Sequence, residues 1–117
     1  MSSRGGRVPA PPTGEQWDLR FANKKAARNW ELLCNTAATN CAEMHARLSA
    51  DPRKVFNADR HHRLKGELST GAYGGLTLEQ WQYEITGSGR VWFLIDDNNR
   101  KVWLTAVESG HPSKTDK

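Results

Sequence analysis

Alternating hydrophobic and polar residues predict a β-meander in the C-terminal third of the chain. Three runs are rich in the aromatic and β-branched residues that strands favour: Trp81–Thr86, Arg90–Ile95 and Val102–Val107. Gly87–Gly89 forms a short turn between the first two runs, and the polar segment Asp96–Lys101 separates the second from the third. No helical periodicity competes with this pattern, so we predict three antiparallel strands.

The N-terminal half combines a strand pattern with a helical one. Trp17–Phe21 alternates and predicts a first strand, and Asn23 is suited to cap the helix that follows. From there, apolar residues recur every three or four positions, which predicts one buried helical face. These residues are Ala26, Trp30, Leu33, Ala37, Cys41, Met44 and Leu48. Polar residues at positions 35–40 predict a division into two helices, and Asp51-Pro52 ends the second.

The order of these elements predicts an α+β fold, with an N-terminal strand, a two-helix hairpin and a three-stranded antiparallel meander. Between the helices and the meander we expect a basic connector, Arg53–Lys65, and a glycine-rich loop, Gly66–Thr77. The loop precedes a strand and not a helix, which argues against a nucleotide-type phosphate loop. We expect a flexible leader at residues 1–15, a single domain at 16–112 and a polar tail at 113–117.

Composition narrows the class of protein. With 117 residues, 37% of them hydrophobic, the chain can build one domain with a modest core. A net charge of +4 favours an anionic partner but is too small to establish nucleic-acid binding. The two cysteines match no metal-ligand spacing, so we expect neither a metal nor another cofactor. Without a secretory signal or a membrane-length apolar run, the sequence predicts a cytoplasmic protein that does not act in membranes.

The meander separates two sets of side chains. A turn at Gly87–Gly89 would place Thr86 opposite Arg90 and Glu84 opposite Trp92. Alternation along the strands then defines two faces. One face carries Trp81, Tyr83, Ile85, Val91, Phe93 and Ile95, and the other carries Gln82, Glu84, Arg90, Trp92 and Leu94.

Three side chains near one corner of this sheet are suited to acid–base chemistry on a phosphate. We expect Ile95 to pair with Val102. The third strand then ends beside Arg90, and His111 lies just past that end. With Glu84, this corner would combine a carboxylate, a guanidinium and an imidazole. The same spacing fits a surface ion pair beside a solvated histidine, and spacing alone favours that simpler interpretation.

Short motifs follow one another in a recognisable order. After the first strand come Ala26-x3-Trp30-x2-Leu33 in the helical pair, Leu64-Lys65-Gly66, the Trp81/Tyr83/Ile85 strand, and Gly89-Arg90-Val91-Trp92 leading to Ile95-Asp96. From Trp17 to Pro112 this order resembles the RelE/ParE superfamily of toxins from bacterial toxin–antitoxin pairs, with the RelE-like branch favoured. Because the motifs are short, the resemblance supports the fold more strongly than the function.

The resemblance implies a small toxin that a cognate antitoxin neutralises. In the RelE-like branch it implies a metal-independent endoribonuclease that cleaves mRNA on the ribosome and so inhibits translation. The substrate's own 2′-hydroxyl attacks the adjacent phosphate, leaving a 2′,3′-cyclic phosphate and a 5′-hydroxyl. Such chemistry needs a base near the 2′-hydroxyl, positive charge on the phosphate and an acid for the leaving oxygen.

Carried over by position, the resemblance implies roles for individual residues. Arg90 matches an arginine after the hairpin glycine and would hold the scissile phosphate, and His111 would be acid or base. Glu84 and Gln82 stand where ribosome-dependent relatives often have lysine or arginine. Glu84 is therefore either a base or the mark of an inactive site. The expected RNA-binding residues are Lys65, Arg63, His62, Gln82 and Trp92, although His61 and His62 are expected mainly as exposed loop residues.

Three functions fit these features. The first is the endoribonuclease toxin. The second is a ParE-like toxin that poisons DNA gyrase, which the same fold would carry. The third is a non-catalytic nucleic-acid-binding module, in which the basic connector grips phosphates and Trp92 or Trp103 stacks on bases.

A protein partner is expected on physical grounds as well. Trp92, Leu94 and Trp103 fall on one face of the predicted sheet, and the helices can cover only one of its two faces. The uncovered face would stay partly apolar, and exposed apolar patches mark partner surfaces. An antitoxin segment would cover it.

Overall fold

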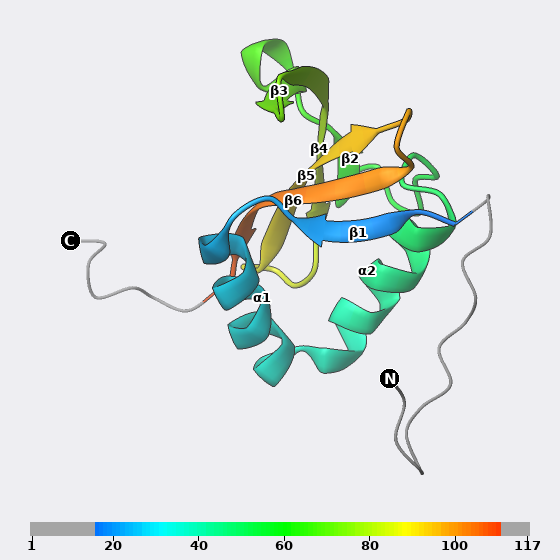
Figure 1. Cartoon of the computed structure of the whole chain (residues 1–117). Coiled ribbons are helices and arrows are strands. Elements are labelled where there is room, and N and C mark those ends of the chain that lie inside the picture. The colour runs from blue at the N-terminus through cyan, green and yellow to red at the C-terminus, as the bar shows by residue number, and fades with distance from the viewer. Residues whose placement is uncertain (1–15, 111–117) are drawn as a thin grey trace, which may run out of the picture.

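The computed structural model describes residues 16–110, whose elements are shown in Figure 1. Strand β1 (Asp18–Phe21) precedes the helices α1 (Lys24–Thr36) and α2 (Ala38–Ala50). They are followed by β2 (His61–Arg63), the short 3-10 helix η1 (Gly66–Ser69) and β3 (Thr70–Tyr73). Three longer strands come last: β4 (Leu76–Glu84), β5 (Arg90–Asp96) and β6 (Lys101–Glu108).

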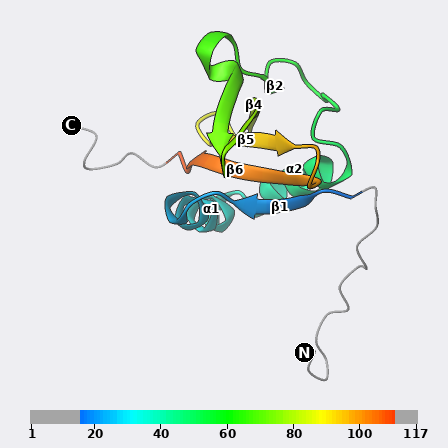
Figure 2. The same ribbon diagram turned by 45° about the horizontal axis from the view of Figure 1, so that its top comes forward.

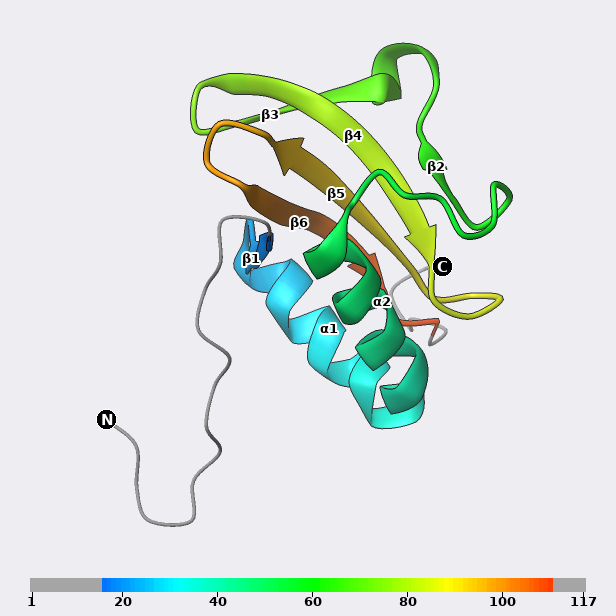
Figure 3. The same ribbon diagram turned by 90° about the vertical axis from the view of Figure 1, so that its right-hand side faces the viewer.

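The strands form one sheet in the order β1-β6-β5-β4-β2, and β3 also pairs with β4. β1 runs parallel to β6, whereas the other pairs are antiparallel. Both helices lie against one face, the inner face (Figure 3). β3 and η1 lie on the opposite side, the outer face, as Figure 2 also shows. No helix in the described part of the chain is long and apolar enough to span a membrane.

Local sequence signals fix the helix ends. The Asn23 side chain accepts a hydrogen bond from the N–H of Ala26 at 2.8 Å, which confirms the predicted cap. Ala37 leaves helical geometry and separates α1 from α2, so the predicted division is also confirmed. This break puts the thiols of Cys34 and Cys41 in contact from two helices, where one continuous helix would keep them two turns apart. Both are free cysteines, and burial raises the pKa of Cys41 to about 12.

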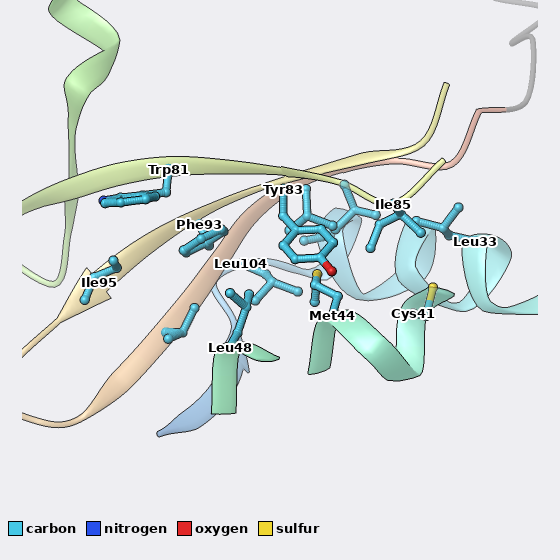
Figure 4. Close-up of a cluster of buried hydrophobic side chains, with 14 residues drawn as sticks. Leu33, Cys41, Met44, Leu48, Trp81, Tyr83, Ile85, Phe93, Ile95 and Leu104 are labelled. Atoms are coloured by element: carbon cyan, nitrogen blue, oxygen red, sulfur yellow. The ribbon is translucent and has the colours of Figure 1, made fainter. Parts of the chain in front are cut away.

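The core lies between the helices and the inner face of the sheet (Figure 4). All six side chains that alternation assigned to one face are buried there, which confirms that face and shows that the helices cover it. From the helices, Leu33, Met44 and Leu48 complete the cluster. Burying side chains of this size contributes about 1.5–3 kcal/mol each. The hydrophobic pattern therefore determines which face is left for function.

The register of the first hairpin differs from the prediction by two residues. Glu84 lies opposite Arg90, and Gln82 lies opposite Trp92. The loop is longer than predicted and occupies positions 85–89. The carbonyl oxygen of its last residue accepts the N–H groups of its first two, at 2.8 and 3.1 Å. Because side chains alternate with a period of two, a shift of two residues leaves every side chain on its predicted face.

Two segments predicted as connector and loop are strands instead. β2 pairs with β4 within the basic connector, and β3 pairs with β4 within the glycine-rich loop. The β3–β4 turn is made by Gly74 and Gly75, whose φ angles are 61° and 81°. Glycine adopts this left-handed region without the steric cost that other residues incur. The glycines thus mark a tight hairpin, where the sequence had indicated a loop.

His61 lies in the core and not in an exposed loop, contrary to prediction. It is fully buried next to the rings of Phe56, Trp81 and Tyr83. Its Nε2 lies 2.9 Å from the carbonyl oxygen of Pro52, and its Nδ1 has no hydrogen-bond partner. Because a carbonyl only accepts, the proton is on Nε2. Burial lowers the pKa of His61, since a charged ring would lose its hydration there.

The chain itself covers part of the outer face. Leu94 points outward but is only 1% exposed, because β3 lies over it. A methyl group at Gly71 would come within 2.8 Å of Leu94 Cδ2. The rings of Tyr73 and Trp103 stack nearby, with centroids 4.4 Å apart. The apolar outer surface is therefore smaller than the sequence predicts, and Trp92 is left beside the open part.

Candidate active site

Cross-strand pairing aligns two rows of side chains on the outer face. Residues directly opposite each other in antiparallel strands point to the same side of the sheet. The first row crosses β2, β4, β5 and β6 and consists of His62, Gln82, Trp92 and Ala106. The second row crosses β4, β5 and β6 and consists of Glu84, Arg90 and Glu108. The structure thus brings together five of the eight predicted site residues.

An open pocket lies where the two rows meet on β5 and β6. It has a volume of about 220 Å³ and is lined by Arg90, Trp92, Ala106 and Glu108. Drug-sized ligands generally occupy larger cavities, of about 300–1,000 Å³. The pocket therefore suits a small group such as a phosphate or a single base.

A bulge in β6 places Glu108 in this pocket. Phe93 pairs with Leu104, but the preceding residue on β5, Trp92, pairs with Ala106, so that Thr105 is an extra residue. Such a bulge changes the direction of the side chains that follow. Without it, the predicted pairing would put Val107 opposite Arg90. With it, Val107 is buried and Glu108 lies opposite Arg90.

Arg90 is held by a weak ion pair. Its Nε lies 3.3 Å from Glu108 Oε1, yet that nitrogen makes no hydrogen bond of good geometry. The Arg90 side chain is 41% exposed and that of Glu108 is 67% exposed. Exposed pairs of this kind contribute only about 0–1 kcal/mol, so an incoming phosphate can displace Glu108. Among the described residues, Glu108 is the only ionic partner of Arg90.

Gln82 positions Trp92. The Trp92 indole N–H donates a hydrogen bond of 2.9 Å to Gln82 Oε1 across the β4–β5 pair. This bond fixes the orientation of the indole ring beside the pocket. The side-chain oxygen of Gln82 is therefore engaged with Trp92, and the predicted role of Gln82 in RNA binding stays a prediction.

His62 lies at the other end of the first row. Its Nδ1 is 2.9 Å from the carbonyl oxygen of Ala58. The ring is partly buried and shares the outer face with Gln82, the residue opposite it on β4. The sequence had indicated an exposed loop residue, because β2 was not recognised as a strand.

The basic residues of the connector are largely engaged within the protein. Arg53 donates to Asp97 with both Nη atoms at 2.8 Å and to Glu79 at 3.1 Å. These bonds lower the pKa of both carboxyl groups. Arg60 donates to the carbonyl oxygens of residues 84 and 85 at 2.9 and 3.1 Å. Arg63 donates to the Ser69 carbonyl at 3.0 Å. These three arginines of the connector therefore hold neighbouring segments together and do not form an open cationic surface.

Two predicted site residues, Arg63 and Lys65, lie outside these rows. Arg63 lies opposite Trp81, which faces the core, and its guanidinium is 3.8 Å from Glu79. Lys65 is exposed beyond the end of β2 and immediately precedes η1. His111 lies outside the described residues. The described part of the chain also contains no group of three or more His, Cys, Asp or Glu side chains that could hold a metal ion.

Glu108 is the functional candidate that sequence reasoning missed. One signal for it exists in the sequence. The buried positions of β6 step by two from Val102 to Leu104 but by three from Leu104 to Val107. A three-residue step within a strand pattern indicates a bulge, and it assigns the next residue to the outer face.

The fold is similar to three solved structures. One chain of the RelBE2 toxin–antitoxin complex from Mycobacterium tuberculosis aligns with a TM-score of 0.53 and 21% identity, over 80% of this chain and 96% of that one. A chain of the archaeal RelE–RelB complex from Pyrococcus horikoshii aligns with a TM-score of 0.57 and 14% identity, over 84% and 99%. A chain of the YoeB dimer from Staphylococcus aureus aligns with a TM-score of 0.53 and 14% identity, over 80% of this chain and 95% of that one.

In sequence, the chain matches no protein-family model and no curated protein. At 14–21% identity, the structural similarity establishes the fold. The predicted RelE-like α+β architecture is therefore confirmed, including the strand, helix pair and antiparallel meander in the predicted order. The function of the site depends on its own residues and not on the fold.

Proposed function

We propose that this chain is the toxin of a toxin–antitoxin pair and acts as an endoribonuclease on mRNA at the ribosome, thereby inhibiting translation. The observation that carries the proposal is Arg90 in an open pocket on the outer face, beside Trp92 and between Glu84 and Glu108. Two of the similar structures are toxin–antitoxin complexes, which supports a cognate antitoxin as partner. The same proposal places the protein in the cytoplasm.

The reaction needs proton transfer and charge stabilisation, because the attacking hydroxyl belongs to the RNA. Arg90 exchanges Glu108 for the scissile phosphate and stabilises the charge that develops on its oxygens. The 2′-hydroxyl loses its proton to a base and attacks phosphorus, and the bond to the 5′-oxygen breaks. The leaving oxygen takes a proton from an acid, giving a 2′,3′-cyclic phosphate and a 5′-hydroxyl. No metal ion is required in this scheme.

The remaining residues take supporting roles in this proposal. Trp92 provides a ring on which a base stacks, worth about 1–3 kcal/mol. His111 supplies the proton to the leaving oxygen. Glu84, directly opposite Arg90, is a carboxylate within the second row and a candidate base. Lys65 supplies positive charge from beyond β2.

One observation favours the second candidate function, gyrase poisoning by a ParE-like toxin. Two carboxylates flank Arg90, and the connector arginines at positions 53, 60 and 63 are engaged in internal hydrogen bonds. RNA-binding surfaces gain most of their affinity from free cationic groups. A site this weakly basic also fits a toxin that acts on a protein target.

The test compares wild type with Arg90→Ala, using purified protein and mRNA with and without ribosomes. We expect wild type to produce fragments ending in a 2′,3′-cyclic phosphate, and Arg90→Ala to lose at least about 100-fold in rate because the phosphate charge is no longer stabilised. Arg20→Ala is the matched control, because Arg20 is an exposed arginine on β1 whose one ionic partner in the described part of the chain is Asp18.

Growth on induced expression separates the candidate functions. We expect arrest by wild type and relief by Arg90→Ala or His111→Ala. Intact transcripts together with a DNA-damage response would select gyrase poisoning. Salt-dependent RNA binding without product would select the non-catalytic binding module.

A further inference from the structure

His62 has one ring nitrogen fixed by the backbone. Its Nδ1 lies 2.9 Å from the carbonyl oxygen of Ala58. Because a carbonyl only accepts, Nδ1 carries the proton and the Nε2 of the neutral ring carries a lone pair. The turn that presents Ala58 is itself closed by three backbone N–H groups that donate to Asn57 at 2.8–3.0 Å. The ring is thus held in one tautomer before any substrate arrives.

Strand pairing directs this ring to the outer face. His61 points into the core, so its neighbour His62 points to the opposite side, where it lies opposite Gln82. Only β4 separates β2 from β5, which carries Arg90. Two strand spacings separate the two backbones by about 10 Å, and Arg90 lies two residues along β5 from Trp92, which is in the row of His62. A sugar–phosphate unit bound by both side chains would therefore run diagonally from the first row to the second, past the hydrogen-bonded pair of Gln82 and Trp92.

We infer that His62 is the general base of the proposed cleavage, an inference that rests on the proposed function. Nε2 accepts the 2′-hydroxyl proton while the 2′-oxygen forms its bond to phosphorus. The bond from phosphorus to the 5′-oxygen breaks, and that oxygen is protonated by the acid on the opposite side. The imidazolium at His62 then returns its proton to water. Arg90 stabilises the phosphate throughout.

His62 is better suited to this role than Glu84. An imidazole accepts a proton most effectively near neutral pH, whereas a carboxylate is a weak base there. Glu84 lies directly opposite Arg90, so a phosphate bound to Arg90 would be close to that negative charge. We therefore assign the base to His62 and not to Glu84.

The test uses His62→Asn in the full-length protein, with the RNA substrate and ribosomes of the assay above. The asparagine amide can take the place of Nδ1 and keep the hydrogen bond to Ala58, while the atom equivalent to Nε2 is removed. We expect kcat to fall by about 10²–10⁴-fold with little change in KM. We also expect the rising limb of the pH–rate profile, which a general base imposes, to disappear. His45→Gln is the matched control, because His45 lies on α2 and bonds to Ser49.

Three results would overturn the inference. If wild type cleaves RNA and His62→Asn keeps its rate, His62 takes no part, although the proposed function stands. If His62→Asn is slower but keeps the rising pH limb, its role is binding and not proton transfer. If wild type itself produces no cleavage, the proposed function fails and this inference fails with it. His62→Gln is a second variant without the imidazole. Unfolding curves of both variants show whether a loss of rate comes from lost proton transfer or from a loss of folded protein.

Discussion

At the residue scale, the carboxylate of Glu108 offsets the positive charge that Arg90 brings to the pocket. Glu108 is 3.3 Å from the Arg90 guanidinium and competes with any phosphate for it. We predict that Glu108→Gln strengthens binding of a short non-cleavable RNA by a few fold, because a like charge is removed from the phosphate site. The gain should shrink as salt rises, since the residue is exposed to solvent. Quenching of tryptophan fluorescence, to which Trp92 beside the pocket contributes, reports the binding.

Glu67→Gln is the control for this experiment. Glu67 lies in η1, outside the two rows, and its loss changes the net charge equally. If both variants bind RNA with the same affinity, the effect belongs to net charge and not to the pocket. If Glu108→Gln binds more weakly than wild type, Glu108 holds Arg90 in the conformation that receives the phosphate.

The buried His61 makes stability depend on pH. Burial lowers its pKa in the folded protein, so the unfolded chain binds more protons as pH falls below the ordinary histidine value of about 6.5. The stability is thus complete above about pH 6.5 and declines below it. We predict a lower urea midpoint at pH 5 than at pH 7 for wild type. His61→Phe should be less stable at pH 7, because the Pro52 carbonyl loses its donor, but should show a flatter profile.

His45→Gln provides the comparison, because it removes a histidine of α2 that lies outside the core. This variant should retain the wild-type decline between pH 7 and 5. If the decline persists in His61→Phe and vanishes in His45→Gln, the pH dependence of stability comes from His45 and the prediction for His61 is wrong. Urea unfolding followed by tryptophan fluorescence provides the midpoints.

At the scale of elements, the alternation of side chains along a strand was easier to predict than the residues that the strand pairs with. The faces of β4 and β5 were predicted correctly despite a two-residue error in register, because that error preserves the alternation. Arg90, Glu84 and Trp92 were therefore assigned to the correct surface. Glu108 was missed because the extra residue Thr105 reverses the assignment in the last part of β6.

The short strands β2 and β3 could not be predicted from their own residues. β2 has three residues and two of them are histidines, whereas β3 contains a glycine, which strands usually disfavour. β2 exists because β4 offers it hydrogen-bonding partners that are distant in sequence, whereas β3 is held against β4 by the tight turn at Gly74 and Gly75. The opposite orientations of His61 and His62 follow from that pairing, and so does the turning of Arg63 away from the pocket.

Gly71 allows β3 to lie close to the outer face. A Cβ there would be 2.8 Å from Leu94 Cδ2 and 3.4 Å from Gln80 Oε1, and Leu94 is buried. We predict that Gly71→Ala destabilises the protein by about 1–3 kcal/mol, the usual cost of overpacking. Gly87→Ala is the matched control, because a Cβ at Gly87 meets nothing within 4 Å. Urea unfolding measures both, and equal stabilities would show that β3 moves away from Leu94 without cost.

At the scale of the whole molecule, the two sides of the sheet differ in how firmly they are held. The inner face has two helices and a continuous core. Within residues 16–110, the outer face is covered only by β3 and η1, whose residues are exposed or half-buried, together with a small cluster around Leu94. The candidate site lies on β5 and β6 beside the segment formed by β3 and η1. The inner-face side chains of β5 and β6 are packed in the core.

Hydrogen exchange should reveal this asymmetry. We predict that the N–H groups of residues 66–75 exchange through local opening, because few buried contacts hold them. Residues 90–96 of β5 are paired on both sides and mostly buried, so their exchange should require opening close to global unfolding. Gly71→Ala should speed exchange in residues 66–75 far more than in β5. Equal exchange rates for both segments in the wild type would mean that β3 and η1 unfold together with the core, so that the pocket edge could not open independently of the sheet that carries Arg90.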